Sequence, residues 1–214
     1  MPPGAVDTRE RLFLGVVSSM AAGLVLWGMQ DRLGPLFAVG KLIDPRAVSA
    51  IADQVEGATE DEWVYDAWDL VGSTIDYQGF GSDLEFVDSH IRCQRCYLPM
   101  EVVKSGASNC VGKSALLASI LRNRLPAERV EMVVGYLANG SLGGHAWVEV
   151  QLENGRWYLL EATQPPKGWL PVELSGSRYL PAVYLNDQQV DCQTDDFCVS
   201  IAAGCGCEQE PWAH

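Results

Sequence analysis

The chain has 214 residues, of which 48% are hydrophobic and 20% are charged, and its formal net charge is −13. This length and composition suit one compact domain with extensions at its ends. The acidic balance argues against a nucleic-acid partner, because neutralising a phosphate backbone requires clusters of lysine and arginine, and the sequence has no such cluster.

Residues 12–29 carry no charged side chain. A stretch of this length lies at the lower limit for a membrane-spanning helix. Its glycines and serines also suit close packing of a helix within a protein or an assembly, and the core of a signal peptide is a third interpretation. We therefore expect residues 1–45 to form an apolar helix and a connector, with residues 12–29 contacting a membrane or a helix-packing partner. The protein would then be membrane-associated or part of a larger assembly.

Two helices are predicted next, at residues 46–55 and from Thr59 to about Tyr77. Thr59 can cap the second helix, and Glu62 stands where a capping box requires it. Apolar residues follow at helical spacing, which predicts that Trp68 is a core residue.

Residues 104–117 predict a loop that turns into a helix with a cysteine in its first turn. Ser108 and Asn109 are the candidate N-cap residues. Apolar residues recur at helical spacing after the cysteine, so Lys113 is expected to face solvent. Unpaired backbone N–H groups and the positive end of the helix dipole favour the thiolate of Cys110. Because the thiolate is the nucleophilic form, Cys110 is the candidate nucleophile.

Three strands are predicted after this helix, at residues 128–137, 143–150 and 157–161. The second has an alternating pattern and contains His145, one of the three histidines of the chain and the best candidate for a base. A turn signal joins it to the third strand, which ends at Glu161. In such a hairpin the carboxylate of Glu161 can reach the imidazole, fix its tautomer and stabilise the imidazolium.

The cysteine at a helix start, the His-Ala-Trp-Val-Glu strand and the acidic residue that ends the next strand resemble the transglutaminase-like superfamily of papain-type thiol enzymes. The resemblance covers roughly residues 60–190, and the motifs occur in the family's order and approximate spacing. The family usually has aspartate at the third position. Glu161 is longer by a methylene group and can still accept a hydrogen bond from the imidazole N–H.

The predicted fold class is α+β, with helices packed on an antiparallel sheet. The resemblance implies a transglutaminase-like or papain-like core, in which the helix bearing Cys110 packs on the sheet bearing His145 and Glu161. We expect residues 46–190 to form this catalytic domain, with residues 167–181 as a covering loop.

Six cysteines remain besides Cys110, namely Cys93, Cys96, Cys192, Cys198, Cys205 and Cys207. An even number allows disulfides and would indicate an oxidising compartment. Alternatively, Cys93-x-x-Cys96 and Cys205-x-Cys207 supply thiolates for a zinc ion, or the thiols are free. A redox role for the first pair is disfavoured because no strand-to-helix unit surrounds it. Residues 191–214 form an acidic, cysteine-rich tail in each case.

These features predict a thiol-dependent acyl-transfer enzyme that acts on peptide or isopeptide amides through Cys110, His145 and Glu161. In such an enzyme the acyl group of the substrate is first attached to the Cys110 sulfur as a thioester. If water then attacks the thioester, the protein is a cysteine peptidase or amidase, and this is the outcome that we expect. If an amine attacks it, the protein is a cross-linking transglutaminase. The non-catalytic alternative is a structural or assembly protein, such as a component of a virion or a membrane complex. The predicted partner is a protein or peptide substrate, and the site implies no cofactor and no metal.

Overall fold

The computed structural model describes residues 42–79, 84–87, 90–93, 98–138, 142–176 and 178–192. These residues fall in the larger of the two units into which the chain divides, Pro35–His214. The predictions for residues 12–29 and for the tail beyond residue 192 lie outside the described residues. Among the residues that are described, no helix is both long and apolar enough to cross a bilayer.

The first described elements are the 3₁₀ turn η1 (Arg46–Val48) and the helices α2 (Ser49–Ala52) and α3 (Glu60–Thr74). Helix α3 begins with the predicted capping box. The Thr59 hydroxyl accepts a hydrogen bond from the Glu62 N–H, and the Glu62 carboxylate accepts one from the Thr59 N–H, both at 3.2 Å. The predicted start of this helix is therefore confirmed.

A short parallel pairing fixes the chain just before the cysteine helix. Helix α4 (Pro99–Ser105) ends at Gly106, whose φ of 66° lies in the left-handed region that favours glycine. Strand β4 (Ala107–Ser108) then pairs with β1 (Asp76–Tyr77). The Asp76 N–H also donates to the Gly106 carbonyl at 2.8 Å. The chain therefore enters the next helix along a path that backbone hydrogen bonds define.

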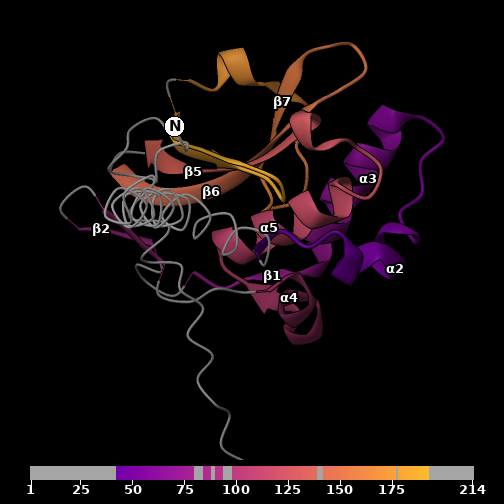
Figure 1. Cartoon of the computed structure of the whole chain (residues 1–214), viewed down its shortest axis with the longest axis horizontal. Coiled ribbons are helices and arrows are strands. Elements are labelled where there is room, and N and C mark those ends of the chain that lie inside the picture. The colour runs from indigo at the N-terminus through magenta and orange to yellow at the C-terminus, as the bar shows by residue number, and fades with distance from the viewer. Residues whose placement is uncertain are drawn as a thin grey trace, which may run out of the picture. The chain divides into compact units, whose positions relative to one another are not determined.

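Helix α5 (Cys110–Leu121) is the centre of the domain, and all 12 of its residues are buried. The Asn109 side chain caps its start by accepting a hydrogen bond from the Gly112 N–H at 3.0 Å. The prediction that Lys113 faces solvent is wrong, because its exposure is 0%. The helix contacts the sheet as well as the other helices, so it has no solvent face (Figure 1).

Among the described residues, the main sheet has six strands in the order β10-β9-β5-β6-β7-β8. Every neighbouring pair is antiparallel. The strands are β5 (Val130–Ala138), β6 (Leu142–Gln151), β7 (Trp157–Leu160), β8 (Leu170–Pro171), β9 (Tyr179–Leu185) and β10 (Val190–Cys192). The turn η2 (Ala127–Arg129) precedes β5, and a separate hairpin pairs β2 (Leu84–Val87) with β3 (His90–Cys93). Helices α2 to α5 lie together on one side of the main sheet (Figure 1), so the α+β prediction is confirmed.

The segment predicted as a covering loop, residues 167–181, contains more regular structure than expected. It includes β8, the turn η3 (Val172–Leu174) and the first residues of β9. Pro181 lies within β9, next to a shift in the register between β5 and β9. Such irregularities tolerate proline in a strand. As a result Tyr179, at the start of β9, is part of the sheet.

Alternate residues of β6 enter different apolar clusters. Ala146 and Val148 pack with α5 in the main core, whereas Trp147 belongs to a second cluster that includes Tyr179. Because successive strand residues point to opposite faces, His145 is on the same face as Trp147.

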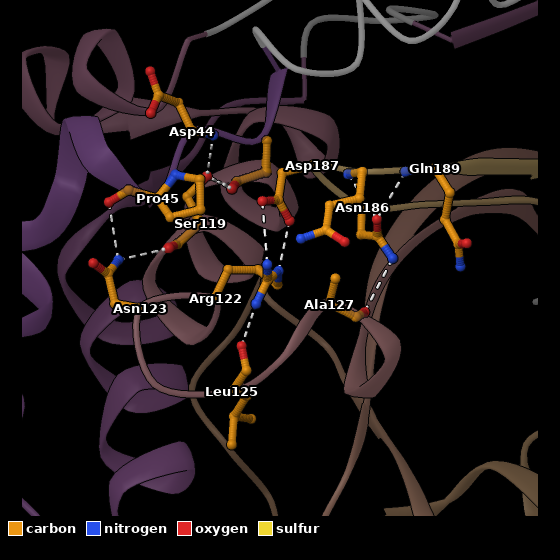
Figure 2. Close-up of polar contacts among 12 residues, drawn as sticks. Asp44, Pro45, Ser119, Arg122, Asn123, Leu125, Ala127, Asn186, Asp187 and Gln189 are labelled. Atoms are coloured by element: carbon orange, nitrogen blue, oxygen red, sulfur yellow. Dashed lines mark hydrogen bonds and ion pairs between the residues drawn. The ribbon is translucent and has the colours of Figure 1, made fainter.

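Polar contacts fix the end of α5 that is opposite to its cysteine (Figure 2). Arg122 forms an ion pair with Asp187, which follows β9, with N···O distances of 2.5 and 3.2 Å. The Asn123 side chain donates to the Pro45 carbonyl at 3.0 Å. These contacts join α5 to the sheet and to the segment that leads into η1, so the helix is anchored at both ends.

Candidate active site

Cys110 is the first residue of α5, as predicted, and 7% of it is exposed. It is a free thiol. The Asn109 cap and the β1–β4 pairing set the direction in which the helix begins. The sulfur is therefore presented at the positive end of the helix dipole.

His145 contacts both of the other predicted site residues. Its Nε2 lies 2.7 Å from Oε2 of Glu161, and its side chain also forms a hydrogen bond with Cys110. Since Nε2 is engaged by the carboxylate, Nδ1 is the ring nitrogen that is left for the thiol. The structure therefore brings together three residues that lie on α5, on β6 and directly after β7.

Burial and these contacts act in opposite directions on the pKa of His145. Burial lowers this pKa, whereas the hydrogen bonds to Cys110 and Glu161 and the electrostatic effect of these two groups raise it, to about 9 in total. The imidazole thus binds a proton more tightly than an ordinary histidine does. This property suits a group that accepts a proton from a thiol.

The Glu161 carboxylate accepts hydrogen bonds on both of its oxygens. Oε1 accepts from the N–H and the hydroxyl of Thr163, at 3.1 and 2.7 Å. Oε2 accepts from His145 and from the hydroxyl of Tyr179, the latter at 3.1 Å. Burial raises the pKa of Glu161, but the contact with His145 and the bonds from Thr163 outweigh burial and lower it. The carboxylate therefore stays ionised beside the imidazole.

The sequence of this region matches a known family. A family model described as the transglutaminase-like superfamily matches residues 49–162, a range that includes Cys110, His145 and Glu161. The chain belongs to the transglutaminase-like superfamily. The family prediction is thereby confirmed, and membership identifies the protein in general terms as a thiol-dependent type of enzyme.

Solved structures similar to this superfamily member include those of Legionella pneumophila LapG. One of them aligns with a TM-score of 0.46 and 12% sequence identity, covering 72% of this chain and 90% of that chain. A calcium-bound form of LapG aligns with a TM-score of 0.45 and 10% identity, covering 71% of this chain and 88% of that chain. No curated protein sequence matches the chain.

Trp68, on helix α3 of the superfamily fold, fixes the backbone of Glu161. Its indole N–H donates to the Glu161 carbonyl at 2.8 Å, although the two residues are 93 positions apart. Its predicted place in the core is confirmed by an exposure of 3%. The hydrogen bond to Glu161 was not predicted, and neither were those from Thr163 and Tyr179. Only Thr163 gave a signal in the sequence, because it lies two positions after the carboxylate it contacts.

Trp147 packs beside the imidazole. Its ring lies at 26° to that of His145, with the centroids 6.2 Å apart, and its N–H donates to Glu149 at 2.9 Å. Gly135 faces His145 across the β5–β6 pair. A side chain at Gly135 would meet the Trp147 ring at 2.9 Å. Glycine at this position therefore makes room for the indole that lies beside His145 and for the backbone of Leu180 and Pro181 on β9.

Lys113, one turn after Cys110, joins α5 to the end of α3. Its ammonium donates to the backbone carbonyls of Gly72 and Ile75, which lie where α3 ends. Burial lowers the pKa of Lys113 despite the opposing effect of nearby carboxylates. This buried lysine satisfies carbonyls that the end of a helix leaves without partners.

Among the side chains that the structure describes, no cluster of three or more histidine, cysteine or acidic groups could hold a metal ion. The side chains of the other cysteines lie outside the described residues. Disulfides, a zinc site and free thiols therefore all stay predictions for these six residues: Cys93, Cys96, Cys192, Cys198, Cys205 and Cys207.

Proposed function

We propose that the protein is a cysteine hydrolase that cleaves an amide bond of a peptide or isopeptide substrate. Cys110 is the nucleophile, His145 the base and Glu161 the group that orients the base. The observation that supports this most directly is the double engagement of His145, which contacts the thiol and the carboxylate at once. A nucleophile, a base and an orienting group in mutual hydrogen-bonding contact are the parts that thiol and serine hydrolases share.

In the acylation step, His145 takes the proton from the Cys110 sulfur, and the thiolate attacks the carbonyl carbon of the substrate. The oxygen of the tetrahedral intermediate carries a negative charge, and the backbone N–H of Cys110 at the helix start donates to it. The C–N bond then breaks, and the leaving nitrogen takes the proton from His145. The acyl group is left as a thioester on Cys110.

In the deacylation step, His145 takes a proton from water, and the water oxygen attacks the thioester carbonyl. The C–S bond breaks, the acid product leaves, and the thiolate recovers its proton from His145. Glu161 stabilises the imidazolium in both steps because its charge and its hydrogen bond act on Nε2. Its own proton affinity stays low, so it does not take the proton from the imidazole.

The fate of the thioester separates hydrolysis from transamidation. When the protein is incubated with casein and a fluorescent primary amine, we expect new amino termini or free acids and no covalent incorporation of the amine. Incorporation that depends on Cys110 would instead make the protein a cross-linking transglutaminase.

A second candidate is a structural protein that keeps this scaffold without turnover. It is favoured by the burial of Cys110 and His145, each of which is only 7% exposed. The two candidates differ in access to the sulfur. A hydrolase admits an extended peptide to Cys110, whereas a scaffold reacts only with small reagents.

The deciding experiment is mass spectrometry with a thiol-reactive peptide probe on the wild type, on Cys110→Ala and on His145→Ala. We expect the probe to label Cys110 before any of the other six cysteines. His145→Ala should slow this labelling by roughly 100-fold or more, the usual effect of losing a general base. Cys110→Ala should remove it and leave the circular dichroism spectrum unchanged. Equal labelling of all cysteines would contradict the proposal.

A further inference from the structure

Tyr179 contacts the same carboxylate oxygen that His145 uses. Its hydroxyl lies 3.1 Å from Oε2 of Glu161, and His145 Nε2 lies 2.7 Å from that atom. An ionised carboxylate only accepts hydrogen bonds, so the hydroxyl must be the donor. Its proton is held firmly, since burial and the charge of Glu161 both raise the pKa of Tyr179.

The hydroxyl is aimed by a well-defined piece of backbone. Tyr179 begins β9 and pairs with Leu137 of β5, and its N–H donates to the Ser175 carbonyl at 3.0 Å. Its ring meets that of Trp147 edge to face, with centroids 5.2 Å apart, and 6% of the residue is exposed. Few other orientations are open to a tyrosine packed in this way.

A glutamate needs more restraint than a shorter acid would. Its side chain has one more rotatable bond than aspartate, so its carboxylate can occupy more positions around the imidazole. Thr163, two positions after Glu161, restrains Oε1 with two hydrogen bonds. Tyr179 restrains Oε2 from a different strand, which fixes the plane of the carboxylate.

We propose that Tyr179 is a positioning residue that holds the Glu161 carboxylate against His145, and through it the imidazole against Cys110. This role rests on the proposed function of the site. In this role the hydroxyl of Tyr179, and not the bulk of its ring, positions the Glu161 carboxylate.

The test measures the rate at which iodoacetamide alkylates Cys110, followed by mass spectrometry as a function of pH. This rate reports on the contact between imidazole and thiol whether or not any amide is hydrolysed, so failure of the proposed hydrolysis would not by itself decide this experiment. The variants are Tyr179→Phe and, as the matched control, Tyr184→Phe. Tyr184 lies on the same strand, but its charged neighbours are Glu149, Glu131 and Asp191.

Removing a hydrogen bond to a charged group should slow alkylation in Tyr179→Phe about 5- to 20-fold at neutral pH. Tyr184→Phe should stay within about twofold of the wild type, since it leaves the site intact. The acid limb of the plot of alkylation rate against pH should move to higher pH by about half a unit to one unit in Tyr179→Phe only. The reason is that the charged form of the Glu161 carboxylate loses a hydrogen-bond donor.

A double-mutant cycle with Glu161→Ala separates positioning from a general structural effect. When the carboxylate is absent, adding Tyr179→Phe should change the rate by less than about twofold. Equal slowing in both backgrounds would overturn the proposal, as would a wild-type rate and profile in Tyr179→Phe alone. If Glu161→Ala does not fold, the shift of the acid limb in Tyr179→Phe decides the question.

Discussion

Replacing Gly135 by alanine tests whether the close packing behind His145 is required. Gly135 lies opposite His145 in the β5–β6 pair, at the shift in the register with β9. A methyl group there would lie 2.9 Å from the Trp147 ring and 2.9 Å from Cα of Pro181, and it would clash most severely with the Leu180 carbonyl oxygen, which is closer than either. Two of these three neighbours are backbone atoms, which cannot move without disturbing β9.

Overpacking in a core typically destabilises a protein by about 1–3 kcal/mol. Because the obstacle here is mainly backbone, we expect Gly135→Ala to lose about 3 kcal/mol, at the upper end of that range. With a urea dependence of about 2 kcal/mol per molar, the unfolding midpoint should fall by about 1.5 M. The displaced indole of Trp147 should also move His145 and slow alkylation of Cys110 by about tenfold or more.

The assay is urea unfolding followed by tryptophan fluorescence, with Gly176→Ala as the matched control. A side chain at Gly176 would meet no atom within 4 Å, so this variant should change the free energy of unfolding by less than about 1 kcal/mol. If Gly135→Ala unfolds at the same urea concentration as the wild type, the packing argument is wrong. Lower stability with unchanged alkylation would refute only the link from Trp147 to His145.

Three further predictions follow from the charged groups. The rate of acyl transfer should fall as the pH rises through about 9, because His145 then loses the proton that the leaving amine needs; Glu161→Gln should move this limb to lower pH. Burial and the charges of Glu149 and Asp191 raise the pKa of Glu131, so the folded protein resists ionisation of this carboxyl group. The stability of the fold should therefore fall as the pH rises through that pKa. We expect Glu131→Gln to raise the melting temperature at pH 8 and not at pH 4. Lys113→Met should lower the free energy of unfolding by about 2 kcal/mol, because the carbonyls of Gly72 and Ile75 lose their donor. The control is Lys167→Met, at an exposed lysine, which should change the free energy of unfolding by less than about 0.5 kcal/mol. Equal melting temperatures at both pH values in Glu131→Gln, or equal losses in the two lysine variants, would contradict these arguments.

Local signals in the sequence were sufficient to predict the helices and strands that form the site. The capping box of Thr59 and Glu62 fixed the start of α3, and the apolar spacing after Cys110 predicted α5. Alternation and a turn signal predicted the strand with His145 and the one that leads to Glu161. Each of these features depends on neighbours within a few positions, which a sequence displays directly.

The residues that support Glu161 were decided by tertiary structure alone. Trp68 contacts it from 93 positions away, and Tyr179 reaches it because a segment expected to be a loop pairs with β5 as a strand. The burial of Lys113 likewise depends on the packing of other elements around α5. A sequence shows which side chains can donate or accept, but the fold determines which of them meet, because that choice depends on how separate elements pack.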